Sequence, residues 1–294
     1  MKKNKAQGQI SYLIRLLTDR DEFVRSRVQD QLLELGEDAL PFLEMATRGE
    51  DESLRIQAHL AIKNILPKKL GEKFRLLAHK GLGKDIDLET GMMLLMEFGY
   101  PEIDPNDCHQ KLDDLAQKLS EVLVDSSEPT EIVRAFTNFL FQKMGFKGNK
   151  ENYHDPDNSF INKVLENHTG LPITLSALCV LLAKRLNLPI VGVGMPGHYI
   201  VKYSLPKEPI YFDPFHQGRL LTKNECIQLV KQFGYPFEEH FLSQSTQRET
   251  LIRMLNNLIQ VYKNSNETKK AETLAEYIKI LLNPSRNQPS ERAL

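Results

Sequence analysis

The chain has 294 residues, and its 38 lysines and arginines nearly balance its 39 aspartates and glutamates. This balance argues against binding to nucleic acid or a membrane surface through bulk charge. There is no apolar run long enough to span a membrane, no apolar leader after the basic first residues, and no disulfide framework or metal pair among three scattered cysteines. We therefore expect a cytoplasmic protein without nucleic-acid or membrane partners.

The first hundred residues predict helices arranged as a repeat. Asp21–Arg25 recurs as Asp51–Arg55, thirty residues later, and each copy opens a segment of helical apolar periodicity. Asp21 and Asp51 should cap their helices. The pattern resembles a HEAT repeat. Two units are fewer than a free-standing solenoid needs, so we expect this segment, residues 1–100, to dock on the core of the chain.

Residues 101–245 form the expected core. Helical periodicity continues to about Lys143, and a turn-rich loop then leads to Asn158. A short helix reaches Gly170. The predicted apolar helix and three strands are Pro172–Leu186, Pro189–Val193, His198–Tyr203 and Pro209–Asp213. We expect no strand outside about 188–222, with His198 and Asp213 on adjacent antiparallel strands.

After the strands the pattern is helical again. Thr222 and Glu225 form a capping box that begins a helix reaching Gly234. From about Gln247 the spacing of apolar residues resembles a TPR unit, so residues 246–294 predict a helical hairpin that packs on the core. The fold class is therefore α+β, mainly helical, with a small antiparallel sheet.

Four motifs carry a specific family resemblance: Asn158–Leu165, Gly170–Ser176, Pro196–Val201 and Asp213–Gly218. Together they resemble the SirB-type transglutaminase-like/TPR family of the transglutaminase-like superfamily. The resemblance implies a papain-like site, in which a helix N-terminus and a histidine activate a nucleophile and an aspartate orients the histidine.

The resemblance assigns the histidine and aspartate to His198 and Asp213. His198 can also be a strand-edge residue with a structural hydrogen bond, and Asp213 can cap the Asp-Pro-Phe turn, alone or in addition. The position of the family's cysteine falls on Pro172, two residues after Gly170. Proline suits the first turn of a helix but has no nucleophilic atom.

Other nucleophiles lie further along the same helix. Cys179 sits among leucines and is expected to behave as a buried hydrophobe with an unreactive thiol. Ser176 and Thr174 are better placed, but a hydroxyl needs an aligned base and an oxyanion site. Both hydroxyls can instead bond back to the helix backbone.

The remaining candidates concern binding. Asn158 and Ser159 are expected to cap the helix that ends near Leu165, and the family pattern implies that they also face the pocket. Pro172, Tyr199 and Phe215 complete the candidate binding residues. A metal site built from His154, His168, His216 and His198 lacks a recognisable ligand spacing and is rejected, and no cofactor is expected.

These observations favour an interaction module. Helical repeats present extended surfaces to proteins or peptides, and a transglutaminase-like cleft without its thiol can hold a peptide or a side-chain amide. The alternative is a hydrolase or acyl transferase that uses Ser176 or Thr174 with His198 and Asp213. The partner, the substrate and the oligomeric state do not follow from the sequence.

Overall fold

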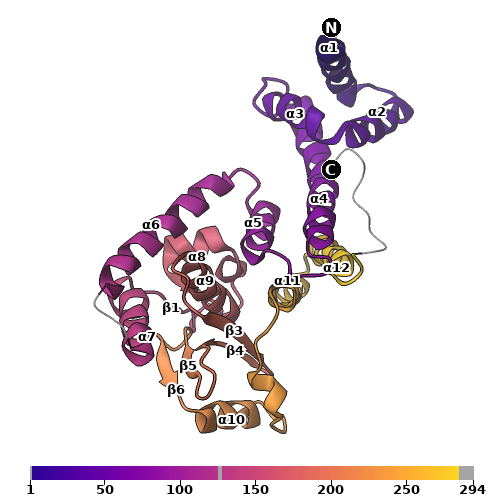
Figure 1. The fold of residues 1–294 in the computed structure, drawn as a ribbon. Coiled ribbons are helices and arrows are strands. Elements are labelled where there is room, and N and C mark those ends of the chain that lie inside the picture. The colour runs from indigo at the N-terminus through magenta and orange to yellow at the C-terminus, as the bar shows by residue number, and fades with distance from the viewer. Residues whose placement is uncertain (1, 125–127, 285–294) are drawn as a thin grey trace. The chain divides into compact units, whose positions relative to one another are not determined.

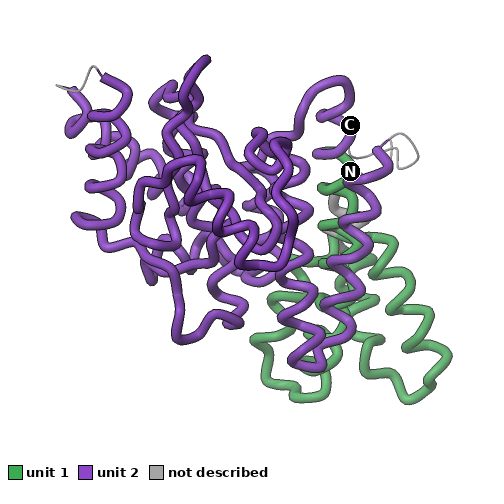
Figure 2. Tube along the Cα trace, turned by 90° about the horizontal axis from the view of Figure 1, so that it is seen from below, with its two compact units in different colours: residues 1–76, 289–294 green, residues 77–288 purple. Residues whose placement is uncertain are grey.

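The computed structural model describes residues 2–124 and 128–284. The chain divides into two compact units between Leu76 and Leu77 (Figure 2). Across the described residues, helices predominate over a small antiparallel sheet (Figure 1), which agrees with the predicted α+β class. Within the same residues, no helix combines the length and apolar character needed to cross a bilayer.

The regular elements of the first unit's described part are all helices. Its elements are α1 (Lys2–Arg15), η1 (Leu16–Thr18), α2 (Glu22–Leu35), η2 (Gly36–Ala39), α3 (Leu40–Ala46) and the beginning of α4 (Glu52–Lys80). Leu17, Leu32 and Leu43 are fully buried in its core. Leucines recurring along these helices therefore supply the apolar surface that holds the unit together.

The predicted repeat has matching contacts in its two copies. Asp21 accepts a hydrogen bond from the amide of Phe23, and Asp51 accepts one from Leu54, so both capping predictions are confirmed. Arg25 donates to the carbonyls five and six residues before it, and Arg55 does the same. The relation to HEAT repeats stays a prediction.

The second unit contains the sheet and most of the other helices. The helices are α5 (Leu88–Gly99), α6 (Pro105–Leu123), α7 (Pro129–Thr137), α8 (Ile161–Asn167), α9 (Pro172–Arg185), α10 (Lys223–Gln232), α11 (Gln247–Asn264) and α12 (Thr268–Leu282). A π-helical turn, η3 (Asn138–Lys143), continues α7, and η4 (Pro156–Ser159) and η5 (Glu239–Leu242) are short 3₁₀ helices. The capping box at Thr222 and Glu225 is confirmed at the start of α10.

The four-stranded sheet is antiparallel, in the order β3 (Ile190–Met195), β4 (His198–Tyr203), β5 (Ile210–Asp213) and β6 (Arg219–Leu221). β4 begins and ends where the sequence predicts, whereas β6 lies in a segment for which the sequence predicts no strand. Cys226 and Val230 of α10 pack on one face of the sheet, and α9 contacts β3 and β4 from the other side (Figure 1). The sheet is therefore covered on both faces.

The expectation that strands occur only between about 188 and 222 is wrong. β1 (Lys147–Gly148) pairs in parallel with β2 (Thr169–Gly170), immediately before α9. Two-residue strands have no periodicity to detect, and the pairing joins segments about twenty residues apart. The Gly148 amide also donates to the carbonyl of Phe215, so this small pair fixes the chain beside the end of β5.

The C-terminal helices α11 and α12 pack against each other, and α11 also contacts α5, η4 and α9. The hairpin therefore docks on the core as expected. Its TPR character and the boundaries at residues 100 and 245 stay predictions, and the part of the predicted hairpin after residue 284 lies outside the described residues.

Candidate functional site

His198 begins β4 directly after a tight turn, as the sequence predicts. Gly197 has a φ of +75°, in the left-handed region that glycine adopts without strain. Arg253 of α11 holds the turn from the other side. Its guanidinium donates to the carbonyls of Met195, at 2.8 Å, and of His198, at 3.0 Å. The backbone of His198 is therefore fixed by both the hairpin turn and a distant helix.

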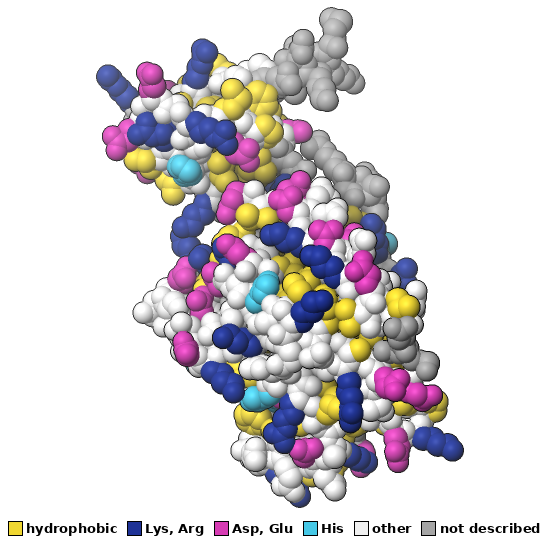
Figure 3. All heavy atoms as spheres, turned by 90° about the vertical axis from the view of Figure 1, so that its left-hand side faces the viewer, with side chains coloured by type: hydrophobic (Ala, Val, Ile, Leu, Met, Phe, Trp, Pro, Cys, Tyr) yellow, Lys and Arg dark blue, Asp and Glu magenta, His cyan; other side chains and the backbone are white. Residues whose placement is uncertain are grey.

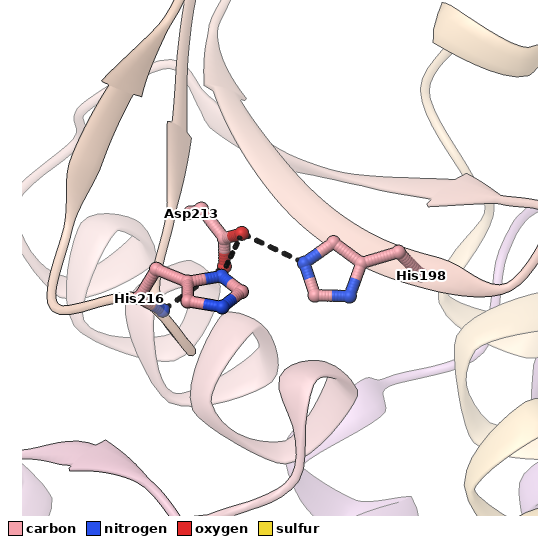
Figure 4. A group of neighbouring side chains, drawn as sticks. All are labelled: His198, Asp213 and His216. Atoms are coloured by element: carbon pink, nitrogen blue, oxygen red, sulfur yellow. Dashed lines mark hydrogen bonds and ion pairs between the residues drawn. The ribbon is translucent and has the colours of Figure 1, made fainter. Parts of the chain in front are cut away.

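The predicted pairing of His198 with Asp213 is confirmed. Nε2 of His198 lies 2.8 Å from Oδ2 of Asp213, and both side chains are buried (Figure 4). Because an ionised carboxylate only accepts hydrogen bonds, Nε2 carries the proton. Nδ1 is then left as the free ring nitrogen and makes no hydrogen bond to the described residues.

Asp213 also caps the turn that follows it, so both roles considered for it hold. Its Oδ1 accepts the amides of Phe215, at 3.0 Å, and His216, at 3.3 Å. Burial raises the pKa of this carboxyl, but the hydrogen bonds and charge interactions with His198 and His216 together lower it by more than burial raises it. The pKa therefore lies below its ordinary value. Asp213 is thus held as a carboxylate of fixed orientation.

His216, which the sequence offered only as part of a rejected metal site, is a member of this site. Its Nδ1 lies 2.7 Å from the same Oδ2 of Asp213 that His198 contacts, and its side chain is 43% exposed (Figure 4). The spacing Asp-x-x-His across a capped turn was the available signal. One carboxylate oxygen therefore accepts hydrogen bonds from two imidazole rings.

Aromatic rings surround His198. The ring of Phe233 stacks on it with centroids 6.4 Å apart, and Phe215 approaches edge-on at 6.3 Å. Tyr153 in turn packs against Phe215. Because Phe233 is 48% and Tyr153 40% exposed, part of this aromatic surface is accessible to a ligand.

A groove of about 670 Å³ adjoins the pair through Phe215 and His216. Its charged lining comprises Lys147, Lys150, Arg219 and a single acid, Glu151. On the face shown in Figure 3, positive and negative side chains are interspersed. The groove is thus a local excess of positive charge beside the site, which favours an acidic ligand.

The candidate nucleophiles on α9 are all buried. The Cys179 side chain is fully buried, which raises the pKa of its thiol well above the ordinary value. Ser176 makes one long hydrogen bond, 3.5 Å to the carbonyl of Tyr199, and the hydroxyl of Thr174 has no partner among the described residues. Neither hydroxyl is hydrogen-bonded to His198. Pro172 occupies the first turn of α9 and is also buried.

The expectation that Asn158 and Ser159 cap the next helix is wrong. Helix α8 begins later, at Ile161, and its N-cap residue Phe160 makes no side-chain capping bond. Asn158 instead donates to the carbonyls of Asn152 and Tyr153, and thereby fixes the loop that carries Tyr153. The hydroxyl of Ser159 is buried without a hydrogen-bond partner in the described part of the chain.

Tyr199 and Phe215, the other candidate binding residues, lie in different places. The hydroxyl of Tyr199 lies 2.7 Å from Thr250 of α11, and the guanidinium of Arg253 lies over its ring. Tyr199 is therefore interior, on the strand face opposite His198. Phe215 is the one that borders both His198 and the groove.

The four histidines His154, His168, His198 and His216 do not come together as a set. His198 and His216 converge on Asp213, and the three ligating atoms lie within 4.8 Å of one another. His168 instead stacks on Phe146, and His154 packs against Tyr153.

Known proteins share parts of this sequence. Residues 106–256 match the transglutaminase-like superfamily. A UPF0162 protein of Xylella fastidiosa is 33% identical over 214 residues, which cover 69% of this chain and 74% of the relative. A UPF0162 protein of Vibrio cholerae is 30% identical over 140 residues, covering 47% of this chain and 52% of the relative. F-box only protein 21 of Homo sapiens is 25% identical over 171 residues, covering 55% of this chain and 27% of that protein. No solved structure matches.

Proposed function

Because this chain belongs to the transglutaminase-like superfamily, we propose that it is a protein- or peptide-interaction module whose binding groups are His198 and Asp213. In this proposal it is of the SirB type and works in the cytoplasm, and HEAT-like and TPR-like helices add binding surface around the core. The core holds a polar group of the partner without turning it over. The observation that carries the proposal is an oriented His–Asp pair to which no nucleophile of the described residues is bonded.

We propose no turnover because α9, the helix that would carry the nucleophile, offers none that is accessible. Proline stands at position 172, where the superfamily resemblance places the attacking cysteine. The Cys179 thiol is further along the helix, fully buried and held protonated by its raised pKa. Ser176 and Thr174 are also fully buried and make no hydrogen bond to His198, so the alternative hydrolase or acyl transferase has no specific observation in its favour.

Binding by the pair follows from its hydrogen-bonding capacity. Asp213 occupies Nε2 of His198, so Nδ1 is the ring nitrogen left to bind a partner, as an acceptor when the ring is neutral and as a donor when it is protonated. The rings of Phe233 and Tyr153 supply apolar contact area, and the basic groove favours acidic residues next to the bound group. An extended peptide segment satisfies all three conditions.

A similar segment also occurs inside a longer protein. The matching segment forms only 27% of F-box only protein 21, so there it is one part of a longer chain. A segment that occurs inside a longer chain can act as a module that binds a partner on behalf of that chain, which agrees with the proposed role.

The test of binding is a peptide selection followed by a measured affinity. Peptides from a random displayed library are selected on the full chain, and a fluorescent copy of the best binder is titrated with wild type, His198→Ala and His240→Ala. His198→Ala should weaken binding by about 1–3 kcal/mol, because a polar group of the peptide loses its partner. The control His240 is 66% exposed on η5 and should have no effect. Equal affinity of His198→Ala and wild type would refute the proposed site.

Turnover is tested separately with an activated ester and a fluorogenic peptide amide. Wild type should leave both intact, and Pro172→Cys should gain reactivity toward the ester, because it places a thiol at a helix N-terminus. Hydrolysis by wild type that is lost in Ser176→Ala would establish the enzyme alternative instead.

A further inference from the structure

The cluster of His198, Asp213 and His216 offers two imidazole nitrogens and one carboxylate oxygen that lie within 4.8 Å of one another (Figure 4). Both nitrogens contact the same oxygen, Oδ2 of Asp213, at 2.8 and 2.7 Å. The proposed binding function needs only the first of these contacts. The convergence of His216 on the same oxygen therefore calls for its own explanation.

The backbone prearranges this convergence. Two amides of the turn after β5 bind Oδ1 of Asp213, and this directs Oδ2 toward the two histidines. His198 is held by Arg253 through its carbonyl and lies between the rings of Phe215 and Phe233. His198 and Asp213 are thus oriented by their neighbours, while the exposed ring of His216 is free to turn.

We infer that His198 Nε2, Asp213 Oδ2 and His216 Nδ1 form a binding site for a divalent transition-metal ion such as Zn²⁺. With metal–ligand distances of about 2.0–2.1 Å, tetrahedral ligands lie roughly 3.3 Å apart. The two contacts to Oδ2 are shorter than this by about half an ångström, as expected of hydrogen bonds whose protons occupy the place of the ion. Binding requires each neutral imidazole to carry its proton on the other ring nitrogen, both N–O separations to lengthen by about half an ångström, and the exposed ring of His216 to turn toward the ion.

The ligand set predicts both selectivity and an open position. Imidazole nitrogen suits zinc, cobalt, nickel and iron, whereas Mg²⁺ and Ca²⁺ prefer sites made of oxygen ligands alone. Three protein ligands leave a fourth position, as in zinc sites that bind water or substrate. His216 lines the groove of about 670 Å³, which gives that position access from outside.

The test uses the metal alone as the probe. Untagged full-length protein, stripped with a chelator and dialysed, is titrated with Zn²⁺ by calorimetry and with Co²⁺ by visible absorption, with Mg²⁺ as the negative control. Wild type should bind one equivalent of Zn²⁺ and develop the intense absorption of tetrahedral Co²⁺. His216→Ala should weaken binding at least tenfold, and His154→Ala, which removes a histidine outside the cluster, should not change it.

His216→Ala is the decisive variant because its side chain is exposed and its loss leaves the His198–Asp213 pair intact. Failure to bind Zn²⁺, or binding unchanged in His216→Ala, would overturn the inference. Neither result affects the proposed peptide binding, which is measured on metal-free protein and depends on His198. Retained peptide binding with no metal binding would therefore leave the proposed function standing and exclude the metal site.

Discussion

Replacement of Gly197 by alanine tests the link between the turn before His198 and the ring of Phe233. A Cβ atom at Gly197 would lie 2.2 Å from Cγ of Phe233 and 2.7 Å from its Cβ. Both atoms lie at the base of the Phe233 side chain, so turning the ring alone cannot remove the clash. The C-terminal end of α10 would therefore have to move. Overpacking of this kind costs about 1–3 kcal/mol.

Gly83 provides a matched control in the same compact unit. Its φ is +73° against +75° at Gly197, but a Cβ atom there meets nothing within 4 Å. Both alanine variants therefore carry the left-handed backbone cost of about 1–2 kcal/mol, and only Gly197→Ala adds the contact with Phe233. We expect the free energy of unfolding to fall by about 1–2 kcal/mol for Gly83→Ala and about 2–5 kcal/mol for Gly197→Ala.

Urea unfolding followed by circular dichroism measures both values, and a double-mutant cycle isolates the contact. In a Phe233→Ala background, which removes the ring but keeps the Cβ atom, Gly197→Ala should cost less than it does in the wild-type background. Peptide affinity should also fall in Gly197→Ala, because the ring stacked on His198 is displaced. If Gly197→Ala costs the same with and without the Phe233 ring, the ring does not constrain the turn and the reasoning fails.

Two further predictions concern titratable groups. Cys179 should resist a disulfide reagent in the folded chain and react on unfolding, because burial raises the pKa of its thiol, and rapid labelling of the native protein at this residue would contradict the assignment. The pKa of Asp213 is lowered below 3.8, so its ionised form stabilises the fold above that pH and the stabilisation is lost as the pH falls through the lowered pKa. Asp213→Asn should therefore be less stable than wild type at neutral pH by urea unfolding, with the difference shrinking below about pH 4, and a difference that does not change with pH would speak against this origin.

The parts of the site that lie close in sequence or on neighbouring strands were predictable. His198 and Asp213 lie at the ends of adjacent strands, and consecutive antiparallel strands place such residues within hydrogen-bond range. The capping box of α10 was predictable for the same reason, since its two residues are three apart. Local chemistry was enough in both cases.

The features that the sequence could not supply depend on contacts across the fold. Arg253 is 55 residues from His198, in a helix whose spacing suggested only a repeat surface. Gly148 pairs with Gly170 without any periodic pattern. The capping role expected of Asn158 failed because its side-chain amide binds the carbonyls of Asn152 and Tyr153 in the preceding loop, and α8 begins only at Ile161.

The hydrogen bonds from Arg253 to the β3–β4 turn couple the C-terminal helices to the site. A chain ending at residue 245 would lose this side chain and Thr250, and with them the bonds to the carbonyls of Met195 and His198 and to the hydroxyl of Tyr199. The superfamily match, which runs to residue 256, includes both of these α11 residues. Any ligand that displaces α11 would therefore remove one of the two supports of the His198 backbone and leave only the β3–β4 hairpin. By reciprocity, occupation of the site would change the affinity of α11 for that ligand.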